Sequence, residues 1–472
     1  MRNFPARLDL SRNETVYDTM GVREHTSDIF VDRFNEIRER LPGAALPWLA
    51  RLRGSAIEHF ANCGLPTPRV EEWKYTNLAQ IVDPKPILAG PSVNGVNRDS
   101  LERYCLDPMP CHRMVFVNGF FRPDLSEIGV VPAGLSMLTL DGALANQPEL
   151  LEAHWGDVFD MSEDRLSGKS DPRPHAMVAL NTAFAGDGAV IHLDHNVSPD
   201  GPIHLIYVTV PEGGRPLMSN PRNLIVAESG AQATIFETFV GDSGNDHFSN
   251  VLTQVSAASG SRLCHYKHQG GAPRGAHIGS SYVRLARDST YNGFVFSDGA
   301  RTSRNEIRVR LEEENVGCYL DGIYLARGEQ RMDNWTRIDH MAPRGKSRQV
   351  YKGVMDGAAH GSFQGKIRVW PNASQSDARQ LNKNLLLTEQ AEAASKPELE
   401  ILTDAVQCAH GSTIGDLDEE SLFYLRSRGV GEEAARNLLI EAFVGEVIDG
   451  LADVPIREYF RKLFDSWLSE AA

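Results

Sequence analysis

Apolar and polar positions divide the chain into three regions with different periodicities. Over residues 29–63, and again over 431–468, apolar residues recur every three or four positions, which places them on one face of a helix. From residue 187 to about residue 412 they form short runs typical of strands. One of these runs alternates strictly, with Ile307, Val309 and Leu311 on one face and Arg308 and Arg310 on the other. The pattern predicts a mainly β core between two helical regions.

These changes of period also predict the domain boundaries. We expect residues 1–186 to form an N-terminal, mostly helical but mixed region, with polar, aperiodic sequence up to about residue 27 and helices over 29–41 and 46–63. Residues 187–412 form the β core, and residues 413–472 form a C-terminal helical domain.

Two C-terminal helices are predicted, each with a broad apolar face. In the first, over 431–449, the expected face consists of Leu438, Leu439, Ala442, Phe443 and Val447. In the second, after Pro455, it consists of Ile456, Tyr459, Phe460, Leu463, Phe464, Trp467 and Leu468. Such faces must be covered, either by the β core of the same chain or by another chain.

A weak repeat runs through the β region. The pattern of a polar residue, a glycine and an apolar residue occurs at Gly293, Gly322 and Gly353, which are 29 and 31 residues apart. Many short strands with a loose repeat are typical of a solenoid, a propeller or a sandwich, and periodicity alone does not choose among them.

The amino-acid composition argues against several classes of function. The formal net charge of −15 argues against a nucleic-acid partner, which needs clustered Lys and Arg. No stretch approaches the roughly 18 consecutive apolar residues of a membrane helix, and the N-terminus carries no apolar run typical of a signal peptide. The six cysteines are scattered rather than arranged as a disulfide framework. We expect a cytoplasmic protein with reduced thiols and no membrane partner.

Common catalytic motifs do not fit. Gly345-Lys346-Ser347 ends like a phosphate-binding loop but lacks the preceding glycine and reads as a β-turn, so we expect no ATP hydrolysis by this chain. Cys264 and His268 would share a strand face but lie roughly 13 Å apart, too far for one metal ion. Cys105, Cys111 and His112 form no specific pattern.

Cys408 and His410 are the most informative pair. They lie on a predicted strand that runs from about Leu399 into a helix, whose start is indicated by Asp416 and Glu419 and whose end by Gly429. At positions i and i+2 both side chains face the same way, about 6.6 Å apart, within reach of a shared iron or iron–sulfur species. Two ligands hold such a species weakly, so a second chain would complete the site. The alternative is that both are core residues.

Several longer segments resemble one family, the SufB/SufD proteins of iron–sulfur cluster assembly. They are Glu71–Thr76, Arg348–Gly353, Gly361–Ile367, Asn384–Leu387 and the Cys-x-His-Gly motif that ends at Gly411. The resemblance implies a right-handed parallel β-helix core flanked by N-terminal and C-terminal α-helical regions, with outward polar side chains free for a partner. A cysteine that SufB carries before its Leu-Leu motif is absent before Leu385, and SufB has His-Glu where this chain has His410-Gly411. Both differences favour the SufD branch.

The resemblance also implies a function. A SufD-like chain is a scaffold subunit, not an enzyme, and no catalytic or resident cofactor-binding residue is expected in it. Its partners are a SufB-like subunit and a SufC-like ATPase, which binds the C-terminal helices. His410 matches the histidine implicated in cluster formation at the SufB–SufD interface, and Cys408 matches the motif's cysteine. An iron–sulfur cluster is then assembled transiently on the complex and is not held stably by this chain alone; iron, sulfide or a whole cluster remains possible at His410.

Two other functions are compatible with a β-solenoid. A carbohydrate lyase or hydrolase would place acid–base groups in an outer groove, and a purely structural adaptor would use Cys408 and His410 only for packing. Trp73 and Tyr75 of the N-terminal segment are interpreted as packing of a loop onto the body of the protein.

Overall fold

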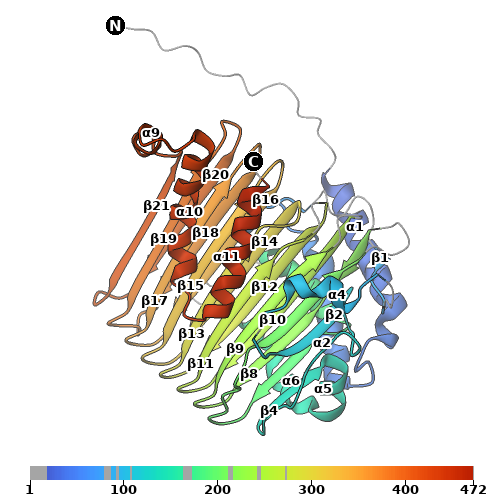
Figure 1. Ribbon diagram of the computed structural model, residues 1–472. Coiled ribbons are helices and arrows are strands. Elements are labelled where there is room, and N and C mark those ends of the chain that lie inside the picture. The colour runs from blue at the N-terminus through green and yellow to red at the C-terminus, as the bar shows by residue number, and fades with distance from the viewer. Residues whose placement is uncertain are drawn as a thin grey trace.

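The chain folds into a β-solenoid of about seven turns with helices at both ends of the sequence, as the family resemblance implied (Figure 1). The computed structural model describes residues 19–78, 87–91, 95–106, 109–162, 173–210, 216–241, 246–271 and 274–470. Within these residues strand exceeds helix, 40% against 28%. The aperiodic N-terminal sequence lies partly outside them, and the first helix already begins at Thr19.

The described helices all lie either before residue 185 or after residue 418. The α-helices are α1 (Thr19–Ile37), α2 (Pro47–Cys63), α4 (Arg98–Leu101), α5 (Leu140–Asn146), α6 (Pro148–His154), α7 (Asp157–Ser162), α8 (Ala176–Phe184), α9 (Glu419–Ser427), α10 (Glu432–Asp449) and α11 (Val454–Ser469). The 3₁₀ turns are η1 (Arg38–Arg40), η2 (Glu71–Trp73), η3 (Glu102–Tyr104) and η4 (Arg173–His175).

Two sheets form the walls of the solenoid. The first sheet contains β1 (Ile87–Leu88), β4 (Leu135–Thr139), β5 (Ala189–Leu193), β7 (Leu217–Ser219), β8 (Arg222–Ala227), β10 (His247–Ala257), β12 (Ala276–Leu285), β14 (Thr302–Leu311), β16 (Arg331–His340), β18 (His360–Val369) and β20 (Glu392–Ile401). The second sheet contains β2 (His112–Val117), β3 (Phe120–Phe121), β6 (Ile203–Thr209), β9 (Gln232–Gly241), β11 (Arg262–Gln269), β13 (Thr290–Ser297), β15 (Gly317–Ala326), β17 (Lys346–Met355), β19 (Asp377–Leu386) and β21 (Gln407–Gly415). From β8 onward, successive strands alternate between the two sheets.

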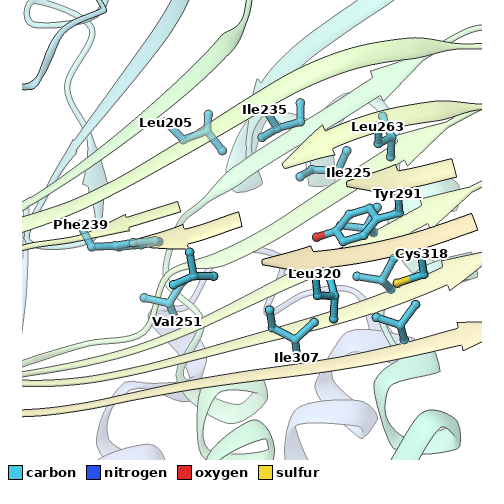
Figure 2. Close-up of a cluster of buried hydrophobic side chains, with 14 of the residues drawn as sticks. Leu205, Ile225, Ile235, Phe239, Val251, Leu263, Tyr291, Ile307, Cys318 and Leu320 are labelled. Atoms are coloured by element: carbon cyan, nitrogen blue, oxygen red, sulfur yellow. The ribbon is translucent and has the colours of Figure 1, made fainter. Parts of the chain in front are cut away.

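Neighbouring strands of the solenoid are parallel and in register. Each turn therefore places its inward side chains directly over those of the turn before, about 4.8 Å away. The apolar members of these columns fill the space between the sheets, as Figure 2 shows for Leu263, Tyr291, Cys318 and Leu320 among others. The alternation read from Ile307 to Leu311 is confirmed, because its apolar residues belong to this core.

The glycine repeat reflects the close stacking of aromatic rings between turns. A Cβ atom at Gly322 would overlap the ring of Tyr351, and one at Gly353 would overlap the ring of Tyr324. The three repeat glycines lie on β13, β15 and β17, so they mark consecutive turns of the second sheet. The weak repeat was therefore a genuine sign of the solenoid.

The N-terminal region covers the outer face of the first sheet. Helices α1, α2 and α8 pack on outward apolar residues of β10 and β12. Further along, Trp73 is buried over the guanidinium of Arg304, with 4.1 Å between the Arg304 Cζ atom and the ring centre. Arg308, which lies on the face opposite Ile307 and was expected to be free for a partner, is instead buried and paired with Glu306. The expectation of free outward polar groups is wrong here, while the packing interpretation of Trp73 is confirmed.

The C-terminal helices α10 and α11 lie across the outer face of the second sheet (Figure 1). Helix α11 buries Ile456, Tyr459, Phe460, Phe464 and Trp467, as the sequence predicted. The buried face of helix α10 overlaps the predicted one only in part. Val447 is buried as predicted, but Leu438 is 47% exposed, and the remaining buried residues are Ala435, Ile440, Val444, Gly445 and Ile448. The β core of the same chain thus covers both helices.

No helix among the described residues is long and apolar enough to cross a membrane.

Candidate functional site

The solenoid ends on two strands that each have a neighbour on one side only. Strand β20 pairs with β18 at the edge of the first sheet, and β21 pairs with β19 at the edge of the second. Their outer edges present backbone N–H and C=O groups that no further strand of the sheet satisfies. Figure 1 shows both strands at the end of the molecule opposite α1. We call β20 and β21 the last turn.

Cys408 and His410 belong to the inward-facing residues of the last turn. They lie in register with Ala378 and Gln380 of β19, which are both buried inside the solenoid. Because no further turn follows, His410 is exposed and Cys408 is only half-buried. The imidazole of His410 forms no hydrogen bond or ion pair with any residue that the structure describes. The expectation that the two side chains face the same way agrees with this register.

The thiol of Cys408 is not activated by its surroundings. Partial burial raises the pKa of this thiol above its ordinary value, and the nearby carboxylate of Asp377 acts in the same direction. The thiol is therefore protonated at neutral pH, and a metal ion or a cationic group brought by another chain would be needed to favour the thiolate.

Apolar side chains are also exposed on the last turn, near Cys408 and His410. Ile401 and Ile414 are 41% and 46% exposed, and both lie in register with inward positions of the preceding turn. Leu402, just beyond β20, is 41% exposed. The last turn thus exposes apolar side chains around the polar Cys408–His410 pair. In every earlier turn the corresponding positions are covered by the next turn.

The local sequence explains why the pair lies on a short edge strand. The segment from Leu399 to His410, read as one strand, is two strands, β20 and β21, which are joined by a corner at residues 402–406. The helix after β21 begins two residues later than predicted, since Asp418, not Asp416, caps α9 by accepting from the backbone N–H of Ser421 at 2.9 Å. Gly429 does adopt a positive φ of 90°, as expected of a residue that follows a helix.

The other residues singled out in the sequence have structural roles. Cys264 and His268 face outward from β11 toward α11, and the His268 ring lies 2.8 Å from the Tyr459 hydroxyl and 3.2 Å from the Asp298 carboxylate. Lys346 and Ser347 begin β17 after a turn, and Ser347 contacts His340 inside the solenoid. Cys105 receives a hydrogen bond from Arg113, and Cys111 is half-buried nearby.

Within the described residues, no group of three or more His, Cys, Asp or Glu side chains is arranged to hold a metal ion. Cys408 and His410 could thus offer at most two ligands to a metal ion, which other groups would have to supplement.

The sequence reading missed a polar cluster inside the solenoid. The carboxylate of Glu237 lies 3.2 Å from the His265 ring and 3.4 Å from the Lys267 ammonium group, and all three are buried. His265 also contacts the Tyr291 hydroxyl at 2.8 Å. The alternation of β11 separates His265 and Lys267 from Cys264 and His268, but alternation alone does not say which face is inward.

Comparison with known proteins gives consistent results along the chain. Residues 24–205 match the SufBD protein N-terminal region, and residues 209–443 match the SufBD core domain of SUF-system FeS cluster assembly. An iron–sulfur cluster assembly SufBD family protein from Synechocystis sp. is 31% identical over 85% of this chain and 87% of its own length. The iron–sulfur cluster assembly protein SufD of Escherichia coli is 27% identical over 85% of this chain and 89% of its own length. The chloroplastic protein ABCI7 of Arabidopsis thaliana is 29% identical, with 96% and 94% covered.

Proposed function

Because the chain belongs to the SufBD family of iron–sulfur cluster assembly proteins, we propose that it is a SufD-type scaffold subunit that pairs with a SufB-type subunit through its last turn. In this proposal it is an assembly factor rather than a turnover enzyme. Nascent clusters form where the two subunits meet, and a SufC-type ATPase supplies the energy. A reducing compartment such as the cytoplasm suits this chemistry, since the thiols must stay free.

The observation that carries the proposal is the uncapped last turn. The edge strands β20 and β21, with Ile401 and Ile414 exposed between them, form one surface. The end strands of another β-solenoid could pair with β20 and β21 and cover these two side chains. Cys408 and His410 would then lie inside the joint, where two ligands from this chain meet ligands from the partner. His410 is the preferred ligand, because its imidazole has no competing partner in the described residues.

The ATPase contact is proposed for helix α9 and the adjoining part of α10. Phe423 and Tyr424 are 74% and 57% exposed, and Leu438 is 47% exposed on the side of α10 that does not touch the sheet. Helix α9 buries only Leu422 among its described residues. Aromatic side chains exposed together are typical of a protein interface.

The test of the interface chemistry is replacement of His410. We expect His410→Ala to block cluster assembly in cells, while the variant still purifies with its SufB-type and SufC-type partners. The matched control is Thr413→Ala, because Thr413 is also exposed on β21 but belongs to the outward-facing set, in register with Lys383. Normal cluster assembly by the His410 variant would leave only the structural adaptor.

The test of the ATPase contact must leave the core intact. Deleting the whole C-terminal region would uncover the apolar cluster beneath α10 and α11, so point changes are preferable. We expect Phe423→Ser combined with Tyr424→Ser to abolish co-purification of the ATPase without lowering the melting temperature by more than about 2 °C. Retained ATPase binding at unchanged affinity would refute this assignment.

A carbohydrate enzyme is not favoured. Its groove would lie on an outer sheet face, but helices cover the middle of both faces: α1, α2 and α8 on the first sheet, α10 and α11 on the second.

A further inference from the structure

A cavity lies where the N-terminal segment crosses the first sheet, away from the last turn. It has a volume of about 260 Å³ and lies between residues 68–77 and the first residues of β14, β16 and β18. Three basic side chains line it, namely Lys74, Arg331 and His360. Hydroxyl groups line it too, including those of Thr302 and Ser362. We call it the basic cavity.

The strand side of the basic cavity is fixed by the register of the sheet. Thr302 pairs with Arg331, and Arg331 pairs with His360, so the three residues form one column along successive turns. Adjacent members are about 4.8 Å apart at the backbone. Arg331 and His360 are thus held next to each other, although like charges at this spacing repel.

The opposite wall is anchored equally firmly. Trp73 is 1% exposed and stacks on Arg304, while Thr76 donates a hydrogen bond to the carboxylate of Asp333. Glu71 forms an ion pair with Lys396. These contacts lie on both sides of Lys74 and Tyr75 in sequence, so the two residues that face the cavity are positioned by buried neighbours.

The acidic groups at the cavity are already engaged. Asp333 accepts from Arg304, Thr76 and Ser362, and the Arg304 guanidinium compensates its charge. The Glu392 carboxylate lies 3.9 Å from His360 Nε2, but its side chain is 76% exposed to solvent. Neither Lys74 nor Arg331 forms an ion pair with any residue that the structure describes.

The charge of Lys74 acts on Glu71, but Glu71 is itself ion-paired with Lys396. Two basic side chains without an ion pair among the described residues stand out in a chain whose net charge is −15. We propose that the basic cavity is a binding site for a small phosphate-bearing molecule. Arg331 would donate to two phosphate oxygens at once, Lys74 would add a point charge, and the Thr302 hydroxyl would complete the donors. The ring of Tyr75, centred 6.4 Å from the His360 ring, offers an aromatic wall for the rest of the molecule. This site does not depend on the proposed subunit contacts.

The experiment is calorimetric titration of the full chain with inorganic phosphate, pyrophosphate and adenosine monophosphate, at constant ionic strength. We expect saturable binding of at least one of these probes at one site. Arg331→Gln and Lys74→Gln should each weaken it at least tenfold. Arg262→Gln is the charge-matched control, because Arg262 is exposed at the start of β11, far from the cavity in the chain. Melting temperatures without ligand should agree among all variants, since the replaced side chains are exposed.

A second readout places the ligand. Burial, together with the charge of Arg331, holds the pKa of His360 below its ordinary value, and a bound phosphate should raise it. We therefore expect ¹⁵N NMR titration of His360 to shift upward in pH when the probe is present. Tighter binding of adenosine monophosphate than of inorganic phosphate assigns an organic phosphate, and equal binding assigns the free anion. Absence of saturable binding, or equal affinity in the Arg331 and Arg262 variants, would overturn the proposal.

Discussion

The same two side-chain types occur in the same two inward columns of the second sheet, once in the interior and once at the end. His265 of β11 and His410 of β21 lie in one column, which passes through Gly293, Leu320, Gln349 and Gln380. Cys318 of β15 and Cys408 of β21 lie in the neighbouring column. The interior members are buried and bonded or packed, and the terminal members are open. Position in the stack, rather than residue type, decides which pair is available for chemistry.

The largest expected difference between the two sites is in stability. Glu237→Gln should lower the free energy of unfolding by about 3–5 kcal/mol, because it leaves the buried Lys267 ammonium group without its carboxylate. Urea unfolding followed by circular dichroism measures this. The double variant Glu237→Gln with Lys267→Met should regain much of the loss, and His410→Ala should change the stability by less than about 0.5 kcal/mol. Equal losses at Glu237 and His410 would contradict the comparison.

The two cysteines should differ by at least about a hundredfold in alkylation rate, because Cys318 is fully buried and Cys408 is partly open. Burial raises the pKa of both thiols, so access rather than thiolate formation separates them. Iodoacetamide labelling followed by peptide mass spectrometry gives both rates in one sample, and labelling in urea should make them equal. Binding of a SufB-type partner should protect Cys408. Fast labelling of Cys318 in the folded chain would show that the interior columns are open as well.

A smaller effect is expected from pH. Burial, aided by the charge of Lys267, lowers the pKa of the interior His277 to about 3, whereas an unfolded histidine titrates near 6.5. Between these values the unfolded chain binds a proton that the folded chain does not, so stability falls by about 1.4 kcal/mol per pH unit as pH decreases. His247 and Glu237 also face this ring. His277→Phe should reduce the slope by that amount between pH 6.5 and 5. An unchanged slope would show that His277 binds its proton equally well in the folded and unfolded chains.

These contrasts also show what the sequence could reveal. Alternation and glycine spacing were enough to predict strands and a repeat, because the rules that produce them are local. The face of α10 was predicted only in part. Leu438 was included because its side chain is apolar, but the residues that contact the sheet are Ile440, Val444 and Ile448. Arg308 was correctly placed on the face opposite Ile307, but the sequence did not reveal that it is buried and paired with Glu306. Charge alone does not show that Trp73, more than two hundred residues earlier, covers the neighbouring Arg304.

For the candidate site, too, the local features could be predicted from the sequence and the long-range ones could not. The i, i+2 spacing of Cys408 and His410 predicted a shared face, and the family motif directed attention to His410. Strand β21 is exposed because it is the last strand of its sheet. This is a property of the whole solenoid and cannot be recognised from any local sequence pattern. The corner between β20 and β21 was missed for a similar reason, since Val406 continues the apolar alternation through it.

Helices α10 and α11 pack across several turns of the solenoid and hold those turns together. Their apolar cluster includes a residue from every second-sheet strand from β9 to β19, namely Phe236, Tyr266, Phe294, Ile323, Val354 and Leu385. In a solenoid where each turn contacts only its neighbours, the turns can unfold one at a time. Helices that pack across many turns couple them, so that these turns unfold together. No residue of β21 belongs to this cluster, so the last turn lies beyond the fastened length. It is held instead by its ladders with β18 and β19 and by a smaller apolar cluster that Leu399 and Cys408 join, so we expect it to open before the rest of the stack.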